Sequence, residues 1–249
     1  MKSQILVSKK KSHMPNIIDI SDITFLGIDG VGDDVTILRS LKYSKQFFPN
    51  VKVKFLTSGN HDSIDCNIEH VQIKNLGYDE FSKFCLTELY QYFDTSYMIY
   101  CHGDGFATNP NAWTDEFLKY DYLGAPWPKS NLERSSYRWD LVKKAYYESQ
   151  KTYFVGNGGF SFRSKKLMQA VSELYKDEYY GIPEDLVIAI IMRKQLEQEG
   201  FKFTNDIGIA GKFSCESPFV DGYILSSDDS FGFHCGGTHP HKVKLLENV

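Results

Sequence analysis

The amino-acid sequence predicts an α/β fold with a mostly parallel central sheet flanked by helices. Short apolar stretches rich in β-forming residues alternate with longer amphipathic ones through the first hundred residues. Strands joined through helices form right-handed crossovers, which gives a Rossmann-like half. A hydrophobic content of 42% and an aromatic content of 15% support a sizeable core. Because no repeat or linker interrupts the chain, we expect a single domain over residues 21–249.

The first half of the chain supplies the alternating strands and helices. Residues 51–57 (VKVKFLT) alternate as a strand does, and the apolar residues of 79–93 recur near helical spacing. Pro49-Asn50 ends the helix that precedes residue 51. The predicted strands are residues 23–28, 51–57, 68–73 and the run that ends at Asp104, and the predicted helices are 36–48 and 79–93.

The second half is less regular. Tyr153 to Arg163 is predicted as two short strands bent around its glycines, and Ser164 to Tyr175 as a helix with Ser164 as N-cap. Pro183 to Gly200 is the clearest helix, because Pro and two acidic residues begin it and a glycine ends it. The tail reads as short strand-like pieces that end near residues 231–234.

Charge, hydropathy and cysteine usage narrow the class of protein. The net charge of −4 shows no global drive toward nucleic acid or an anionic membrane. The longest apolar stretch, Leu186 to Met192, is too short to span a bilayer. Five scattered cysteines indicate free thiols in the cytoplasm, or in the host cytoplasm for a viral protein. Residues 1–20 lack the order of a signal peptide and are expected to be a disordered or cloning-derived segment.

A His-x-Asp pair between glycines is the first candidate site. An apolar run from Tyr97 ends in His102-Gly103-Asp104-Gly105. A carboxylate there sits where open α/β sheets bind ligands, and Asp104 offers oxygen to Mg²⁺ or Mn²⁺. His234 is a second metal ligand if the tail folds back over the sheet edge. The alternative is an Asp turn that caps the next element.

Glu184-Asp185 is the second candidate site, at the start of the clearest helix. Acidic residues in a first turn stabilise a helix through its dipole without any further role. The functional alternative is a general base that deprotonates an acceptor hydroxyl. In that case one carboxylate faces the ligand while the other caps the helix.

Glycines and a tryptophan form the third candidate site. Gly156-Asn157-Gly158-Gly159 is either a hairpin turn or a place where the backbone closely approaches a sugar or phosphate. Trp127, between two prolines, either stacks on a sugar ring or fills the core.

Four motifs taken together resemble an uncharacterised family of glycosyltransferase-like proteins. They are YLGAPW at 122–127, GNGGFSFR at 156–163, Pro183-Glu184-Asp185 and FGFH at 231–234. The resemblance covers roughly residues 22–236. It implies a GT-A type glycosyltransferase that uses a divalent metal and a nucleotide sugar, UDP-sugar above all, with a saccharide as acceptor.

The resemblance also implies roles for individual residues. Asp104 and His234 match metal ligands, with His102 in place of the first acidic position of an Asp-x-Asp motif. Asp185 matches the base of inverting members, with Glu184 beside it in the catalytic pair. The residues expected to contact the nucleotide sugar are Asp29, Gly30, His102, Asp104, Trp127, Asn157, Gly158 and Gly159.

Two other functions stay open at this point. A viral-type enzyme would glycosylate a hydroxymethylated base in DNA, and it needs a basic groove. The candidates for that groove are Lys143, Lys144, Lys151, Arg163, Lys165 and Lys166. Alternatively, the change to His102 indicates a binding module that kept the fold and lost the chemistry.

Overall fold

A computed structural model describes residues 20–32, 35–59, 67–134, 140–150 and 156–249. The predicted N-terminal segment lies, except for Ile20, outside these residues. Within them, no helix has both the length and the apolar character needed to cross a bilayer. The four described cysteines (85, 101, 215 and 235) are free, as expected, and Cys66 lies outside the described residues.

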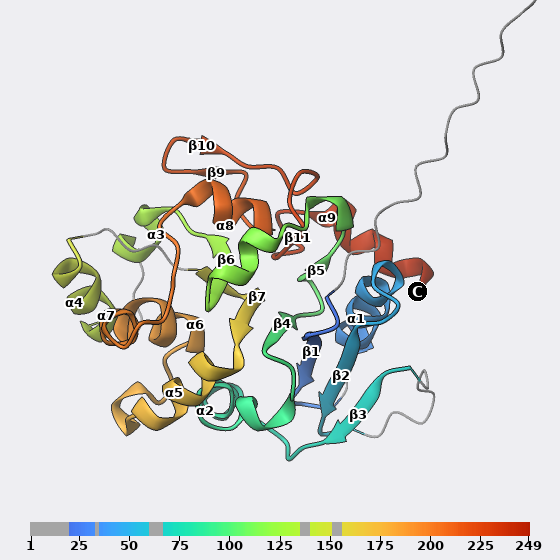
Figure 1. Cartoon of the computed structure of the whole chain (residues 1–249), viewed down its shortest axis with the longest axis horizontal. Helices are drawn as coiled ribbons and strands as arrows, with labels where there is room; N and C mark the ends of the chain where they lie inside the picture. The colour runs from blue at the N-terminus through green and yellow to red at the C-terminus, as the bar shows by residue number, and fades with distance from the viewer. Residues whose placement is uncertain (1–19, 33–34, 60–66, 135–139, 151–155) are drawn as a thin grey trace, which may run out of the picture.

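A six-stranded sheet runs through the middle of the molecule, in the order β3-β2-β1-β4-β7-β6 (Figure 1). Its strands are β1 (Ile23–Asp29), β2 (Lys52–Thr57), β3 (Glu69–Gln72), β4 (Tyr97–Cys101), β6 (Tyr122–Pro126) and β7 (Gly156–Ser164). The first four are parallel, and β7 alone runs against its neighbours β4 and β6. The predicted mostly parallel sheet is confirmed.

Alternate side chains of the strands pack on opposite faces of the sheet. Phe25, Phe55 and Ile99 belong to one apolar cluster, which includes α1 (Val35–Phe47). Leu56 and Tyr100 belong to the other, which includes residues of α2, α5 and α6. The bounds of these helices are α2 Tyr78–Thr87, α5 Lys165–Leu174 and α6 Glu184–Leu186. Because β1 and β4 are buried on both faces, their sequences are nearly continuous apolar runs.

The helices agree with the sequence at their cores and differ at their ends. Ser164 caps α5 as predicted, because its Oγ accepts a hydrogen bond from the Leu167 amide at 3.2 Å. The helix predicted over 183–200 consists of α6, a π-helical turn (Val187–Ile191) and α7 (Arg193–Gln198). The remaining α-helices are α3 Lys129–Arg134, α4 Asp140–Glu148, α8 Ile207–Phe213 and α9 Pro240–Val243, and the 3₁₀ segments are Leu89–Tyr92, Pro110–Ala112, Asp115–Lys119, Asp177–Tyr179 and Lys244–Asn248.

The prediction of two strands around the Gly156–Gly159 segment is wrong. These residues begin the single nine-residue strand β7. The pairing with β6 jumps there: Gly124 faces Ser161, whereas Ala125 faces Asn157. Residues 158–160 therefore lie in an irregularity of one strand rather than in a turn between two, and residues 151–155 lie outside the described part.

The C-terminal part of the chain contributes to a small second sheet beside the six-stranded sheet. It contains β5 (Phe106–Ala107), β11 (Gly232–Phe233) and β8 (Ser214–Cys215), in the order β5-β11-β8. A hairpin of β9 (Phe219–Val220) and β10 (Tyr223–Ile224) follows β8. Since β11 is parallel to β8 and antiparallel to β5, the start of β5 and the ends of β8 and β11 share one edge.

Asp121 provides a test of how the far end of the main sheet is held. Its Oδ1 accepts a hydrogen bond from Ser164 Oγ at 2.7 Å, and its Oδ2 accepts one from the Lys202 amide at 2.8 Å. We expect Asp121→Ala to lower the free energy of unfolding by about 2 to 4 kcal/mol, because two donors lose their acceptor in a buried place. Urea denaturation measures this change. Glu116→Ala, which breaks only the exposed pair with Lys119, is the control and should cost less than about 0.5 kcal/mol; equal losses would contradict this assignment.

Candidate functional site

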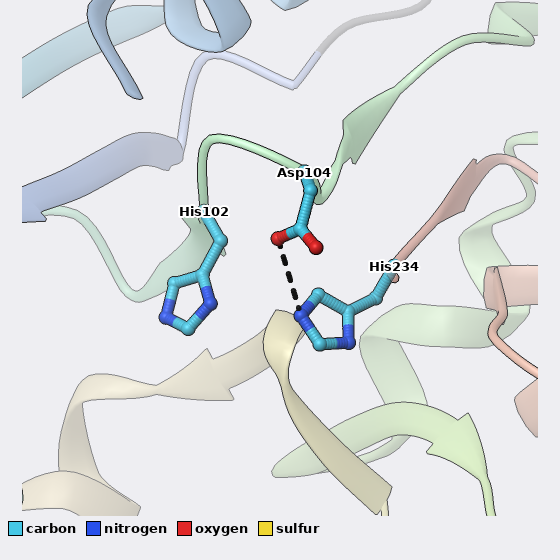
Figure 2. A group of neighbouring side chains, drawn as sticks. All are labelled: His102, Asp104 and His234. Atoms are coloured by element: carbon cyan, nitrogen blue, oxygen red, sulfur yellow. Dashed lines mark ion pairs between the residues drawn. The ribbon is translucent and has the colours of Figure 1, made fainter. Parts of the chain in front are cut away.

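The candidate site lies where β4 and the small sheet meet. His102 and Asp104 follow β4, and His234 follows β11. Figure 2 shows that the three side chains gather beside the turn that carries His102 and Asp104. One ligand atom of each residue lies within 4.8 Å of the others, and His234 Nε2 is 3.5 Å from Asp104 Oδ1. Residues 130 positions apart in sequence thus form one group with two imidazoles and a carboxylate.

Backbone contacts fix this group in place. The Gly236 amide donates a hydrogen bond to Asp104 Oδ2 at 3.1 Å, which leaves Oδ1 toward His234. The His102 amide donates to the Gly159 carbonyl at 2.9 Å. Gly159 also has to be glycine, because a Cβ there would lie 2.1 Å from His234 Nε2. The neighbour at this glycine is the His234 ring, and the close approach to a sugar or phosphate stays a prediction.

The two histidines of the group differ in how readily they are protonated. Burial and the nearby His234 lower the pKa of His102 to about 4, so His102 is neutral near pH 7 and keeps a lone pair for a metal. Burial opposes the charge on His234, but Glu216, Asp104 and Asp185 together raise the pKa of His234 above its usual value. A carboxylate with imidazoles fits a divalent cation such as Mn²⁺, which accepts nitrogen ligands more readily than Mg²⁺ does.

Glu184 is bound to a buried arginine. Arg163 Nη2 lies 2.9 Å from Glu184 Oε1, and the side chains are 0% and 9% exposed. The same guanidinium donates to Ser161 Oγ at 3.0 Å and stacks within 5.3 Å of the Tyr100 ring centre. With its carboxylate held in this way, Glu184 positions the helix, and Asp185 is the better candidate for a base.

Asp185 is buried but accepts hydrogen bonds at both oxygens. The Gly158 amide donates to Oδ2 at 2.9 Å, and the Leu186 amide donates to Oδ1 at 2.8 Å. Burial and the neighbouring Glu184 raise the pKa of Asp185 to about 7, against the opposing effect of these amides and of Arg163. A carboxylate with such a pKa can exchange a proton near neutral pH.

The other predicted site residues lie along the same edge of the sheet. Asp29 ends β1, where its Oδ1 accepts from the Gly32 amide at 2.8 Å and its Oδ2 from Thr57 Oγ1 at 3.1 Å. The Gly30 carbonyl accepts from the Leu76 amide at 2.9 Å. Asn157 Oδ1 accepts from the Gly159 amide at 2.8 Å. These bonds shape the loops at the edge; contact of these residues with a nucleotide stays a prediction.

Two residues of the site, Glu216 and Arg163, were not predicted from the sequence to belong to it. Glu216, directly after β8, accepts a hydrogen bond from Trp127 Nε1, and its Oε1 lies 3.7 Å from His234 Nδ1. No local pattern marks Glu216, because strand pairing over long distances brings it to the site. Arg163 carries a usable signal, since an arginine at the end of an apolar strand needs a buried acidic partner.

The prediction that Arg163 contributes to a basic groove for DNA is wrong. This side chain is fully buried beside Glu184 and offers no charge to the surface. Lys165 and Lys166 line a pocket of about 430 Å³ at the start of β4, the opposite end from His102. Lys165 Nζ donates to the Phe93 carbonyl at 2.6 Å, and Lys166 Nζ lies 3.1 Å from Asp121. Lys151 lies outside the described residues.

Comparison with known protein families identifies the family of this chain. The family described as "Protein of unknown function (DUF5672)" matches residues 65–234, more than half of the chain. The chain belongs to this family. No curated protein matches the sequence. The fold of this DUF5672 member is similar to that of an active-site mutant of LgtC, with a TM-score of 0.51, 14% identity, and coverage of 91% of this chain and 95% of that one.

A second structure of LgtC gives a similar comparison. It is described as the galactosyltransferase in complex with donor and acceptor sugar analogues, and it matches with a TM-score of 0.49 and 12% identity over 91% of this chain and 95% of that one. The likeness to the LgtC mutant supports a GT-A-like glycosyltransferase fold for this DUF5672 chain, as the resemblance implied.

Gly159 allows the candidate metal site to be tested without changing a candidate ligand. We expect Gly159→Ala to abolish Mn²⁺ binding, because the added methyl would collide with the His234 ring. Isothermal titration with Mn²⁺ measures the effect, and circular dichroism checks the fold. Gly237→Ala is the matched control in the same neighbourhood, because a Cβ at Gly237 meets no atom within 4 Å. Full Mn²⁺ affinity in Gly159→Ala would contradict the proposed geometry.

The raised pKa of Asp185 predicts that the free energy of unfolding depends on pH. Because its pKa is about 7 in the folded chain and near 3.8 otherwise, the folded state holds a proton between these values that the unfolded state has lost. Raising the pH across this window therefore destabilises the fold. We expect Asp185→Asn to become more stable relative to the wild type as the pH rises from about 4 to about 7. Denaturation at several pH values in the presence of a chelator tests this, and a difference that is constant with pH would refute it.

Proposed function

We propose that this chain is a metal-dependent glycosyltransferase. It transfers a sugar from a nucleotide-sugar donor, most simply a UDP-sugar, to a hydroxyl of a saccharide acceptor, with inversion. One observation carries the proposal: Gly158 contacts Asp185, and the next residue, Gly159, packs against His234. A candidate base and a candidate metal site thus flank two consecutive residues of one strand, within the length of a nucleotide sugar. The GT-A-like fold is consistent with this activity.

Each residue of the site has a distinct task in this proposal. Asp104, His234 and His102 would hold the divalent cation, which supplies neutralisation of the diphosphate charge when it is bound. Asp185 takes the proton from the acceptor hydroxyl as that oxygen attacks the anomeric carbon, while the bond from that carbon to the diphosphate breaks and the nucleoside diphosphate leaves. Its raised pKa makes it a stronger base than an exposed aspartate, while about half of it is ionised near pH 7.

The ordered loops around the metal site would receive the donor. Asp29 and Gly30 stand at the end of β1, one strand away from His102, which follows β4. This arrangement suits a nucleoside at β1 and its diphosphate at β4, because ligands of open α/β sheets lie beyond the carboxyl ends of the strands. Asn157, Gly158 and Gly159 then lie toward the sugar.

Release of nucleotide tests the activity directly. The chain is incubated with a panel of UDP-sugars and other nucleotide sugars, with Mn²⁺, Mg²⁺, Zn²⁺ or a chelator, with and without saccharide acceptors. Nucleotide release that requires both Mn²⁺ and one donor supports the proposal. The anomeric proton signal of the product, read by NMR, decides between inversion and retention. Absence of release with every donor and metal would sink the enzymatic assignment and leave a binding module.

Asp185→Asn tests the proposed base within this reaction. We expect kcat to fall by about 10²- to 10⁴-fold, because the amide cannot accept the proton of the acceptor hydroxyl. Binding of the free nucleotide with Mn²⁺ should change little, since the ligands of the metal are intact. Asp94→Asn is the control, because Asp94 is largely exposed and lies before β4, at the other end of that strand. A kcat within threefold of the wild type would exclude Asp185 as the base.

A further inference from the structure

Glu216 lies between Trp127 and His234. Its Oε2 accepts a hydrogen bond from Trp127 Nε1, and its Oε1 lies 3.7 Å from His234 Nδ1. The carboxylate is largely buried, with 16% of its side chain exposed. Its backbone carbonyl is 3.0 Å from His239 Nε2, so the main chain is also held. Two nitrogen atoms from different parts of the chain therefore face one carboxylate.

The two nitrogens of His234 face different partners. Nε2 points to Asp104 Oδ1, on the side of the metal-binding group. Nδ1 is buried and makes no hydrogen bond to any described residue, and the separation of 3.7 Å from Glu216 leaves no room for a bridging water. A small rotation of either side chain closes this gap to a hydrogen bond.

A neutral histidine can bind a metal only through the nitrogen that carries no proton. To present Nε2 to a metal, His234 must keep its proton on Nδ1, and a proton there needs an acceptor. We propose that Glu216 is a positioning residue that accepts hydrogen bonds from Trp127 and His234 together and thereby turns His234 Nε2 toward the metal. This inference rests on the proposed metal dependence.

The requirement for a carboxylate at position 216 follows from the number of donors. Trp127 Nε1–H is a donor only, and the required tautomer makes His234 Nδ1–H a donor as well. A carboxylate accepts at both oxygens, whereas a glutamine amide has one oxygen and one NH₂ group. Glutamine would therefore set a donor against Trp127 or against His234.

In this arrangement Trp127 orients Glu216, a role that differs from the sugar stacking or core filling expected from the sequence. Trp127 follows β6, and its indole is half-buried. Because Trp127 binds one oxygen of Glu216, it fixes the rotation of the carboxylate and directs the other oxygen at His234. The residues after β6, β8 and β11 are thereby joined across the site.

A double-mutant experiment isolates this arrangement. Mn²⁺ affinity is measured by electron paramagnetic resonance for the full chain and for Glu216→Gln, Trp127→Phe and the double variant. We expect Glu216→Gln to weaken binding by about 10- to 100-fold. Trp127→Phe should have a smaller effect, since Glu216 still accepts from His234. The double variant should bind more tightly than Glu216→Gln alone, because without the indole N–H the glutamine can turn its oxygen to His234.

A direct reading of the histidine separates this inference from the proposed function. Long-range ¹H–¹⁵N NMR at alkaline pH, without metal, distinguishes the Nδ1–H and Nε2–H tautomers. The role of Glu216 is supported if His234 carries its proton on Nδ1 in the wild type and the tautomer shifts toward Nε2–H in Glu216→Gln. This result supports the role of Glu216 even if Mn²⁺ does not bind. In that case only the proposed metal dependence fails. Glu69→Gln, on the exposed side of a surface pair, is the control. The inference is overturned if the tautomer does not respond to Glu216→Gln, or if wild-type chain binds Mn²⁺ and the double variant binds it no more tightly than the single one.

Discussion

The buried ion pair between Arg163 and Glu184 is the interaction on which the candidate site depends. Arg163 stands on β7, and Glu184 begins the helical segment that covers one face of the sheet. Two charges removed from water are tolerated only with partners, and losing one partner of such a pair typically costs about 3 to 5 kcal/mol. Arg163 has the Ser161 hydroxyl and the rings of Tyr100 and Tyr122 around it in addition. The pair therefore docks the helix on β7 and, with it, the carboxylate of Asp185.

The small sheet has a corresponding effect on the other half of the site. Each of its two-residue strands is too short to be stable alone, but their pairing carries Asp104, Glu216 and His234 to one edge. The main sheet and the small sheet meet at Gly159, whose carbonyl binds the His102 amide and whose missing side chain leaves space for His234. The geometry of the site is thus a property of strand pairing more than of any single loop.

The sequence predicted much of the fold because periodicity is a local property. The strands β1 to β4 and the helices α1, α2 and α5 follow from apolar spacing within a dozen residues. The glycines of β7 were misread as a turn, because isolated Asn-Gly pairs usually form one and the pairing on both sides is invisible in sequence. Arg163 was considered for a basic groove under the alternative with a DNA substrate, because the sequence does not show its buried partner, which lies 21 residues away.

The candidate ligands Asp104 and His234 were named from the sequence, and the family resemblance joined them into one metal site. Asp104 alone is one carboxylate after a strand, and His234 alone is one histidine in a glycine-rich tail. Glu216 could not be named at all, since nothing within its own segment indicates that Trp127 and His234 face it. Contacts of this kind depend on the whole fold.

The alternating faces of β7 constrain how this protein can change over evolution. Phe160 and Phe162 pack on one side of the sheet, while Ser161 and Arg163 face the other. Deleting or inserting a single residue between Gly159 and Arg163 would reverse these faces, which would drive the guanidinium into the aromatic cluster and leave Glu184 without a counter-charge. The length of this buried stretch is therefore constrained, so relatives that keep the site should show no gaps there.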